Sequence, residues 1–508
     1  MRTKTRTEKV KRNVLTSVVL QILKILLSFI SRMIFVKMLG ATYLGINGLF
    51  SNILTVLSVA DLGMATAMMY SLYKPLADGD YEKTSAYVKF YGNIYNVVAI
   101  VVAVVGISIL PFLKFIVNLP EEVGGIYYYY LLMLANLVIS YLFLSRITLL
   151  HADQKSYVVN YIDMCQQFLV FLVQILVLIF TKNFALYLVV AIVGTFGADI
   201  IKSKIAKKKY HVANNNIKIE KKEKRELARN IKDVFLYKFG GAIQSNTDNI
   251  LTSIFVGTVA VGYFSNYTMV VLAITSLTNM IFMALKSSIG NYNVKSDIKD
   301  QERMFYIFED YNYLIIAFCS VCFYVLFPDF ITICFGKDYL LEPITVIFII
   351  LNFYTLNIRQ NLWVYRETTG LFSKVKYVTL VTTTLNLFLS ILGGYFFGIT
   401  GIIGATVISR LLYAWWREPI IIFGDYFKSS PKKYFLGYLT KLGYACVVAY
   451  GLSVISGFII FDNIIIQGFV RAFVIIVLAA ILISAPLKNK DSVKILKKEL
   501  RLKKWLKH

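Results

Sequence analysis

Charged side chains stand inside a stretch that is otherwise apolar enough to cross a lipid bilayer, residues 13–39. Polar residues recur along it at intervals of four and three: Ser17, Gln21, Lys24, Ser28 and Ser31, with Arg32 at the border. This spacing places them on one face of a helix. A charge that faces lipid at mid-bilayer costs about 2.5 to 3.5 kcal/mol, so the stripe predicts a hydrated path in which an ammonium and a guanidinium group bind an anion.

Later apolar stretches carry further cations. We expect Lys238 to join Lys24 and Arg32 in lining a hydrated cavity between two halves of the protein, and Arg359 and Arg410 are further candidates. Each of these residues also has a plainer interpretation, because a long side chain can extend to the membrane interface or form a structural ion pair. The cations outnumber the carboxylates along these faces, which predicts an anionic ligand.

Two acidic residues accompany the cations. Asp61 lies on a polar stripe of the second span, and a shift of 217 residues carries Ser31 of the first span to Asp248. They either carry a coupling proton or sodium ion or neutralise the charge of neighbouring cations.

The elements that must position these side chains are transmembrane helices. Hydrophobic residues make up 57% of the 508 residues, and about fourteen apolar stretches long enough to span a bilayer recur from end to end, among them residues 45–73 and 341–367. The sequence therefore predicts an all-α polytopic membrane protein. No segment between the spans is long enough for a sizeable soluble domain.

The formal charge of +25 gathers at particular loops. Lys and Arg cluster in residues 1–12, 202–230, 428–433 and 497–508. The alternate loops, residues 40–45, 257–262, 397–400 and 461–463, are nearly bare of them. The positive-inside rule then places both termini in the cytoplasm and requires an even number of spans. The basic surfaces face the anionic inner leaflet of the cell membrane, and we expect no nucleic acid partner.

A shift of 217 residues superposes landmarks of the first six spans on the next six. The coinciding pairs are Gly40 with Gly257, Gly45 with Gly262, Pro111 with Pro328 and, after three inserted residues, Arg146 with Arg366. These landmarks predict an internal duplication in which both halves have the same orientation. In transporters built this way, substrate sites lie between the halves near the midplane of the bilayer.

The duplication and the charge pattern together predict the domain organisation. We expect an N-terminal lobe of six helices, a basic cytoplasmic linker, a second lobe of six helices, an added pair of transmembrane helices and a basic amphipathic tail. Their ranges are 1–206, 207–229, 230–424, 425–491 and 492–508.

Motifs that would indicate catalysis are missing from the sequence. It contains no G-x-x-x-x-G-K-[ST], no H-E-x-x-H and no G-x-S-x-G, and its only histidines are His151, His211 and His508. We therefore expect no enzyme activity, no metal and no organic cofactor. A proton or a sodium ion as a coupling ion stays open.

One region resembles a known family. Residues 31–83, which include Arg32, the run YLGINGLFSN and the DLG of Asp61 to Gly63, are similar to the amino-terminal region of bacterial polysaccharide repeat-unit flippases. These are the Wzx-like polysaccharide transporters of the MATE and MurJ superfamily. The form of the run is similar to that of capsule and exopolysaccharide exporters.

The resemblance implies a V-shaped pair of six-helix lobes that open alternately to either side of the membrane. It implies a substrate, an undecaprenyl-diphosphate-linked oligosaccharide of the capsule, exopolysaccharide or O-antigen type, that moves from the cytoplasmic to the outer leaflet of a bacterial plasma membrane. Cations of the first helices hold the diphosphate in such proteins, a role that Lys24 and Arg32 would fill here. A polysaccharide polymerase and other assembly proteins are the protein partners that this function implies.

Three alternatives remain at this stage. A flippase for another prenyl-linked anion, such as a teichoic acid chain or a peptidoglycan precursor, fits the residues equally well. A cation-coupled multidrug antiporter shares the expected fold but should have an acidic cavity. A membrane polysaccharide polymerase usually has a large outer loop with catalytic groups, whereas the longest outer loop expected here has only about fifteen residues.

Overall fold

A computed structural model describes residues 6–58, 64–119, 123–210, 247–369 and 371–487. Within these ranges the chain is helical and has no β-strand, as the sequence predicts. The chain divides into two compact units, Met1–Gly262 and Tyr263–His508. Residues 247–262, which follow the expected linker, therefore belong to the same compact unit as the first repeat.

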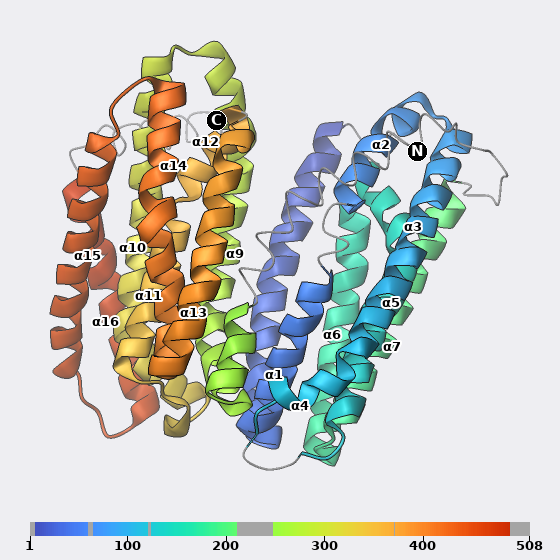
Figure 1. Ribbon diagram of the computed structural model, residues 1–508, viewed down its shortest axis with the longest axis horizontal. Coiled ribbons are helices and arrows are strands. Elements are labelled where there is room, and N and C mark those ends of the chain that lie inside the picture. The colour runs from blue at the N-terminus through green and yellow to red at the C-terminus, as the bar shows by residue number, and fades with distance from the viewer. Residues whose placement is uncertain (1–5, 59–63, 120–122, 211–246, 370, 488–508) are drawn as a thin grey trace, which may run out of the picture. The chain divides into compact units, whose positions relative to one another are not determined.

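The first unit is a bundle of long helices. Helix α5 packs between α3 and α7, and α6 packs against both α1 and α7. Figure 1 shows α3, α5, α6 and α7 running side by side in this unit. The helices are α1 (Arg6–Leu57), α2 (Met64–Asp78), α3 (Tyr81–Ser108), α4 (Leu113–Ile116), α5 (Ile126–Ala152), α6 (Ser156–Thr181), α7 (Phe184–Lys209) and a helix over 247–255.

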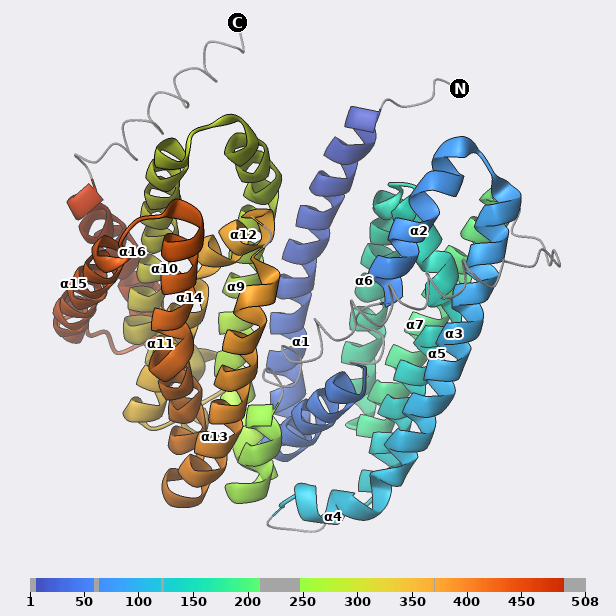
Figure 2. The same ribbon diagram turned by 45° about the horizontal axis from the view of Figure 1, so that its top comes forward.

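The second unit is organised around α10. Both helices of the added pair, α15 and α16, pack against α10 and against each other, as Figure 2 also shows. The helices are α9 (Thr258–Lys295), α10 (Ile298–Cys334), α11 (Pro343–Asn357), α12 (Gln360–Thr369), α13 (Phe372–Ser409), α14 (Trp415–Ile421), α15 (Lys432–Gly457) and α16 (Ile464–Ser484).

Ten helical segments of the described residues are long and apolar enough to cross a membrane. Two of them, Leu15–Leu57 and Tyr377–Phe427, have 43 and 51 residues, about twice the length that one crossing needs. Each contains a glycine with non-helical dihedral angles, so each supplies two spans rather than one. The protein is therefore a multi-pass membrane protein.

Glycine makes these internal turns possible. Gly40 has φ 79° and ψ −176°, and Gly398 has φ 57° and ψ −138°. Side chains with a Cβ rarely adopt such angles, whereas glycine adopts them without strain. Both turns fall where the sequence predicts a short outer connection, at Gly40 and at residues 397–400.

The duplication has a structural counterpart at the outer turns. A Cβ added at Gly45 would overlap the carbonyl oxygen of Thr258, and a Cβ added at Gly262 would lie 2.7 Å from the carbonyl oxygen of Ala41. The 217-residue shift that carries Gly45 to Gly262 also carries Ala41 to Thr258. The shift therefore converts one contact into the other. At both contacts, only glycine leaves room for the facing backbone.

In the span expected over 45–73, α1 ends at Leu57 and α2 begins at Met64, and residues 59–63 lie outside the described residues. The span expected over 341–367 is divided into α11 and α12. At this break, the amide of Asn312 donates hydrogen bonds to the carbonyl oxygens of Asn357 (3.0 Å) and Ile358 (2.8 Å). Side chains within the bundle thus satisfy backbone groups that water cannot reach at this depth.

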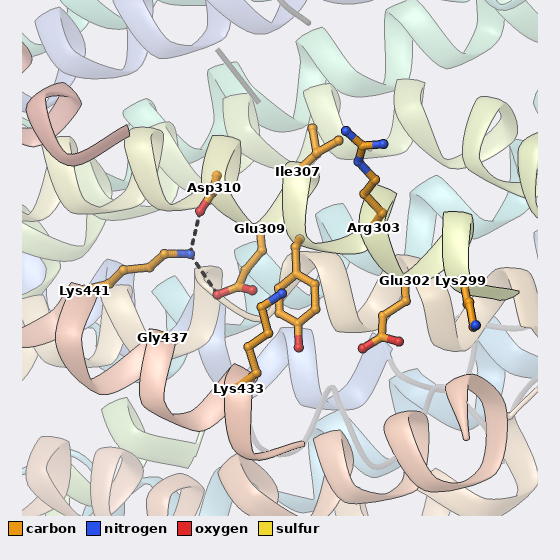
Figure 3. Close-up of a pocket in the computed structure, with 10 residues that line it drawn as sticks. Lys299, Glu302, Arg303, Ile307, Glu309, Asp310, Lys433, Gly437 and Lys441 are labelled. Atoms are coloured by element: carbon orange, nitrogen blue, oxygen red, sulfur yellow. Dashed lines mark hydrogen bonds and ion pairs between the residues drawn. The ribbon is translucent and has the colours of Figure 1, made fainter. Parts of the chain in front are cut away.

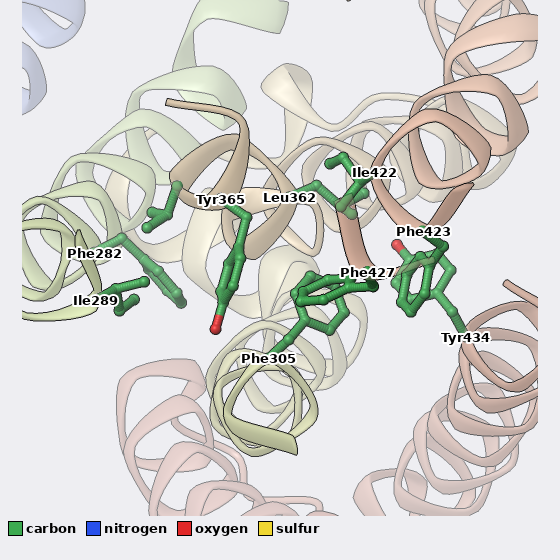
Figure 4. Packing of buried hydrophobic residues seen from close by; sticks show 10 residues of the cluster. Phe282, Ile289, Phe305, Leu362, Tyr365, Ile422, Phe423, Phe427 and Tyr434 are labelled. Carbon is green, nitrogen blue, oxygen red and sulfur yellow. The ribbon is translucent and has the colours of Figure 1, made fainter. Parts of the chain in front are cut away.

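Aromatic packing holds one end of the second unit together. Phe305 of α10 is fully buried, and its ring contacts those of Tyr365, Phe423 and Phe427 at centroid distances of 5.2 to 5.6 Å. Figure 4 shows this cluster, to which α9, α10, α12 and α15 all contribute. Such edge-to-face contacts add stability beyond simple burial, so this end of the unit is rigid.

Candidate functional site

The polar stripe of α1 is anchored at its two ends within the first unit. The amide nitrogen of Asn160 on α6 donates hydrogen bonds to Ser17 Oγ (2.9 Å) and Thr16 Oγ1 (3.1 Å). At the other end, Ser31 hydrogen-bonds to the hydroxyl of Tyr187 on α7. The stripe therefore packs against α6 and α7 at its ends, and its middle part remains for other contacts.

Lys24 lies in that middle part. Its side chain is half-buried, and Ser28 one turn further on is exposed. Among the residues that the structure describes, none forms an ion pair or a hydrogen bond with Lys24. An ammonium group in the middle of a span is unfavourable in hydrocarbon, so its position indicates contact with water or with an anion.

Arg32 lies nearer to the turn at Gly40 and has a more enclosed setting. Its guanidinium interacts electrostatically with Tyr187. Tyr187 also packs edge to face on Phe35 at 5.2 Å between ring centroids, and Phe35 packs on Phe184 at 5.8 Å. Arg32 is thus held at the edge of an aromatic cluster formed by α1 and α7.

Arg359 is engaged in a buried ion pair. It lies in the break between α11 and α12, and its Nη2 pairs with Glu418 Oε2 on α14. Arg366 donates to the other carboxylate oxygen of Glu418 at 3.2 Å. The side chain of Glu418 is only 1% exposed. Both guanidinium groups therefore compensate a carboxylate that is fully removed from solvent.

Arg146 is the equivalent of Arg366 in the first repeat, and its partner is a neutral side chain. Arg146 on α5 donates a hydrogen bond to Ser203 Oγ on α7 at 3.0 Å. Arg366 and Glu418 occupy the matching helices of the second repeat, so the duplicated arginine joins the same pair of helices in both repeats. In the second repeat the partner is the carboxylate of Glu418, which also pairs with Arg359.

Arg410 is also bound within the second unit. Its Nη1 donates to the carbonyl oxygen of Asn352 (3.2 Å), to Asn352 Oδ1 (2.9 Å) and to Thr355 Oγ1 (2.7 Å). The residue is only 5% exposed. Arg410 thus connects the segment after α13 to α11, and we do not retain Arg410 or Arg359 among the residues that we propose for ligand binding.

The structure gives less information about the remaining predicted site residues. Asp61 and Lys238 lie outside the described residues. Asp248 is half-buried in the helix over 247–255, where its carbonyl oxygen accepts a hydrogen bond from Thr252 Oγ1 at 2.7 Å. Of the five predicted cations, the structure places Lys24 and Arg32 on one helix and Arg359 and Arg410 together in the second unit.

The analysis of the sequence missed two groups of charges that join the added helix pair to α10. Lys441 on α15 pairs with Glu309 and Asp310, and Arg471 on α16 forms a two-pronged pair with Asp329. Glu309, Asp310, Lys441 and Arg471 lie in segments that the sequence predicts as spans, and Asp329 directly follows one. The rule that drew attention to Arg32, a charge inside an apolar span, would have found them as well.

Solved structures with a similar fold belong to one class of membrane transporters. "Lipid II flippase MurJ, inward closed conformation" aligns with a TM-score of 0.65 at 13% identity over 93% of this chain and 99% of that chain. A multidrug resistance MATE family transporter of the MOP superfamily aligns with a TM-score of 0.56 at 13% identity, over 78% of this chain and 95% of its own. A mutant of the Vibrio cholerae MATE transporter VcmN gives 0.56 at 15% identity, over 81% and 95%. The fold is that of MurJ and the MATE transporters.

The family follows from the sequence itself. Residues 10–285 match the model of the family described as "Polysaccharide biosynthesis protein", and the chain belongs to that family. The family and the fold that the resemblance implied are thereby confirmed. No curated protein matches the chain in sequence.

Proposed function

We propose that this protein is a flippase that moves an undecaprenyl-diphosphate-linked oligosaccharide repeat unit from the cytoplasmic to the outer leaflet by alternating access. The family, whose description is polysaccharide biosynthesis, and the fold shared with a lipid II flippase support a lipid-linked saccharide as the cargo. The prenyl chain stays in the lipid, and the diphosphate and sugars pass along a hydrated polar path.

The observation that carries the proposal is the setting of Lys24. Its ammonium group is half-buried at mid-span and has no ion-pair or hydrogen-bond partner in the described part of the chain. A diphosphate supplies the negative charge that such a group requires, through charge-assisted hydrogen bonds. Cations that are already paired, such as Arg359, cannot offer this without breaking a buried ion pair.

Lys24 and Arg32 mark two levels of the proposed path. They are eight residues apart on α1, which corresponds to about 12 Å along the helix axis. One diphosphate group would therefore meet Lys24 first and Arg32 later, at the end of α1 near Gly40. Tyr187 beside Arg32 would contribute a hydroxyl and an aromatic surface to the second level.

The positive-inside rule supports the orientation that this direction of transport requires, with both termini in the cytoplasm. The diphosphate and sugars of the substrate would enter from the inner leaflet. The basic loops would face the anionic lipids of that leaflet. Coupling to a proton or a sodium ion would supply the driving force if transport is active. A polysaccharide polymerase would then consume the flipped repeat unit in the outer leaflet.

The experiment reconstitutes the protein in liposomes that contain a short undecaprenyl-diphosphate oligosaccharide. A glycosidase that cannot cross the membrane is added outside, and the fraction of cleaved saccharide is followed in time. We expect Lys24→Gln to slow exposure of the inner pool at least about tenfold, because loss of one charge-assisted hydrogen bond removes about 2 kcal/mol. Lys37→Gln removes an exposed lysine from the same helix and should match the unaltered protein.

Two outcomes would overturn the proposal. Equal rates for Lys24→Gln and the unaltered protein would show that the cation does not act on the diphosphate. No transport of any undecaprenyl-diphosphate saccharide by the unaltered protein would contradict the proposed cargo class. Substitution of a teichoic acid chain or a peptidoglycan precursor on the same prenyl diphosphate then separates the substrates that share this chemistry.

A further inference from the structure

A cavity of about 540 Å³ lies between the N-terminal halves of α10 and α15. Lys299, Arg303 and Tyr306 line it from α10, and Lys433 and Gly437 line it from α15. Figure 3 shows Lys433 extending from α15 toward α10. We call this space the α10–α15 cavity. Its volume lies within the range of about 300 to 1,000 Å³ that small-molecule sites usually have.

The acidic side chains of the cavity are engaged within the second unit. Lys441 Nζ on α15 lies 3.0 Å from Glu309 Oε1 and 2.9 Å from Asp310 Oδ1 on α10. Glu302 accepts a hydrogen bond from Ser429 Oγ at 3.0 Å. The deep end of the cavity is therefore occupied by an internal ion pair, and a ligand that enters would first meet the side chains at the mouth.

Cations stand at this mouth. Lys299, Arg303 and Lys433 are exposed. Lys299 and Lys433 form no ion pair or hydrogen bond with the residues that the structure describes. Lys433 Nζ lies 4.3 Å from the centroid of the Tyr306 ring, a contact that positions the ammonium and leaves the N–H groups that face away from the ring able to donate. The mouth thus presents positioned donors to an anion.

The mouth lies at the depth of lipid head groups. Helix α10 has 37 residues and is about 55 Å long, whereas the hydrocarbon core of a bilayer is about 30 Å thick. Residues 311–328 contain no charged side chain, so this part of α10 crosses the hydrocarbon and the earlier turns extend beyond it. The charge pattern of the sequence predicts that this end faces the cytoplasm, where the inner leaflet contains anionic phospholipids.

An exposed stripe leads from the mouth along α15. Leu436, Thr440, Gly443 and Val447 follow Lys433 at intervals of three or four residues, which places them on the helix face that borders the cavity. Leu436 and Val447 are 67% and 70% exposed. The hydroxyl of Thr440 donates to the carbonyl oxygen of Leu436 at 2.9 Å, so this polar group is already satisfied. A hydrocarbon chain attached to an anion at the mouth can therefore lie on this stripe.

We infer that the α10–α15 cavity binds the phosphodiester head group of an anionic phospholipid of the inner leaflet. Lys299 and Lys433 donate charge-assisted hydrogen bonds to the phosphate from the two helices, and Arg303 adds positive charge at the rim. One acyl chain lies along the stripe that begins at Leu436. The bound lipid thereby connects α10 to the added helix pair. The site is on different helices from Lys24 and does not depend on the nature of the transported lipid.

The alternative is a basic surface that attracts anionic lipids without binding any one of them in place. Lys432 represents such a surface, because it is exposed and adjacent to Lys433 but does not line the cavity. Gly437 offers a second comparison, since no atom lies within 4 Å of the position that a Cβ would take there. A larger side chain at this position would fill the cavity and leave its charge unchanged.

The experiment is native mass spectrometry of the complete protein, released from detergent micelles after titration with phosphatidylglycerol. We expect Lys299→Gln and Lys433→Gln each to raise the Kd of the first bound lipid at least about tenfold, because each loses a charge-assisted hydrogen bond to the phosphate. Gly437→Leu should weaken binding as strongly by filling the cavity. Lys432→Gln should change the Kd less than about twofold, and zwitterionic phosphatidylcholine should bind weakly to every variant. An unchanged unfolding temperature shows that each variant is folded.

Equal effects of Lys432→Gln and Lys433→Gln would overturn the inference, because diffuse attraction would then account for the binding. Unchanged affinity in Gly437→Leu would do so as well, since the lipid would then bind outside the cavity. Displacement of phosphatidylglycerol by an equal concentration of inorganic phosphate would assign the site to a soluble anion. Displacement by a lower concentration of undecaprenyl diphosphate would assign it to the transported lipid, and either result would contradict a resident phospholipid.

Discussion

The middle of α1 and the second repeat of this protein use cations inside spans differently. In the second repeat, Arg359 and Arg366 share the carboxylate of Glu418, and Arg410 donates three hydrogen bonds to α11. In the first repeat, Arg146 donates to a serine hydroxyl, and Lys202 on α7 pairs with Asp163 (3.0 Å) and Asp199 (2.6 Å). Lys24 differs from all of these cations, because it has no partner within the described residues.

This contrast teaches how to interpret charges in membrane helices. A cation in an apolar segment must be compensated, and the compensation comes from the protein, from water or from a ligand. When the protein itself supplies the partner, the cation has a structural role. The predictions below test this distinction, from the largest expected effect to the smallest.

The strongest test removes the shared acid of the second repeat. We expect Glu418→Gln to lower the free energy of unfolding by about 3 to 5 kcal/mol, because Arg359 and Arg366 would remain buried without a counter-charge. Thermal unfolding of the purified protein in nanodiscs measures the effect. Ser203→Ala removes the equivalent partner in the first repeat and should cost only about 1 kcal/mol. Equal effects of the two substitutions would contradict the contrast between the acidic and the neutral partner.

Removal of the second buried guanidinium should have a smaller effect. Arg410→Gln loses hydrogen bonds to Asn352 and Thr355, and we expect a loss of about 2 to 3 kcal/mol in stability by the same unfolding measurement. Lipid transport by the protein that remains folded should be unchanged at low temperature. A specific loss of transport with normal stability would return Arg410 to the group of ligand-binding residues.

Substitution of Gly45 and of Gly262 tests whether the two repeats share the same close backbone contact. Gly45→Ala and Gly262→Ala each place a methyl group against a facing backbone carbonyl, so each should cost about 1 to 3 kcal/mol by forced displacement. Because the two contacts are images of each other, their effects on the unfolding temperature should be similar. Gly443→Ala is the control, since no atom within 4 Å opposes a Cβ there. Very different effects of the two substitutions would contradict the symmetry of the turns.

The smallest effect on stability belongs to Lys24. We expect Lys24→Gln to change the free energy of unfolding by less than about 0.5 kcal/mol, because no interaction within the described protein is lost. The same substitution should have the large effect on lipid transport described above. A marked destabilisation by Lys24→Gln would show that this lysine has a structural partner, and the distinction between Lys24 and the paired cations would then fail.

Much of the fold could be predicted from the sequence. The apolar stretches, the outer turns at Gly40, at Gly257 and at residues 397–400, and the coincidence of the two repeats are local or periodic signals. The division of the span over 341–367 could not be predicted, because its freed carbonyl groups are satisfied by Asn312, which is distant in sequence. The sequence predicted both Lys24 and Arg359 as candidates for binding the diphosphate, and only the structure shows that Arg359 pairs with Glu418.

The sequence by itself determined where helices form, where glycine permits a turn and which loops are basic. These properties depend on each residue and its near neighbours in the chain. The tertiary structure decided which charges are compensated, since Glu418 reaches Arg359, Lys441 reaches Glu309, and Arg471 reaches Asp329 from different helices. The free energy of a charge in a membrane depends on the few atoms around it, and folding alone brings those atoms together.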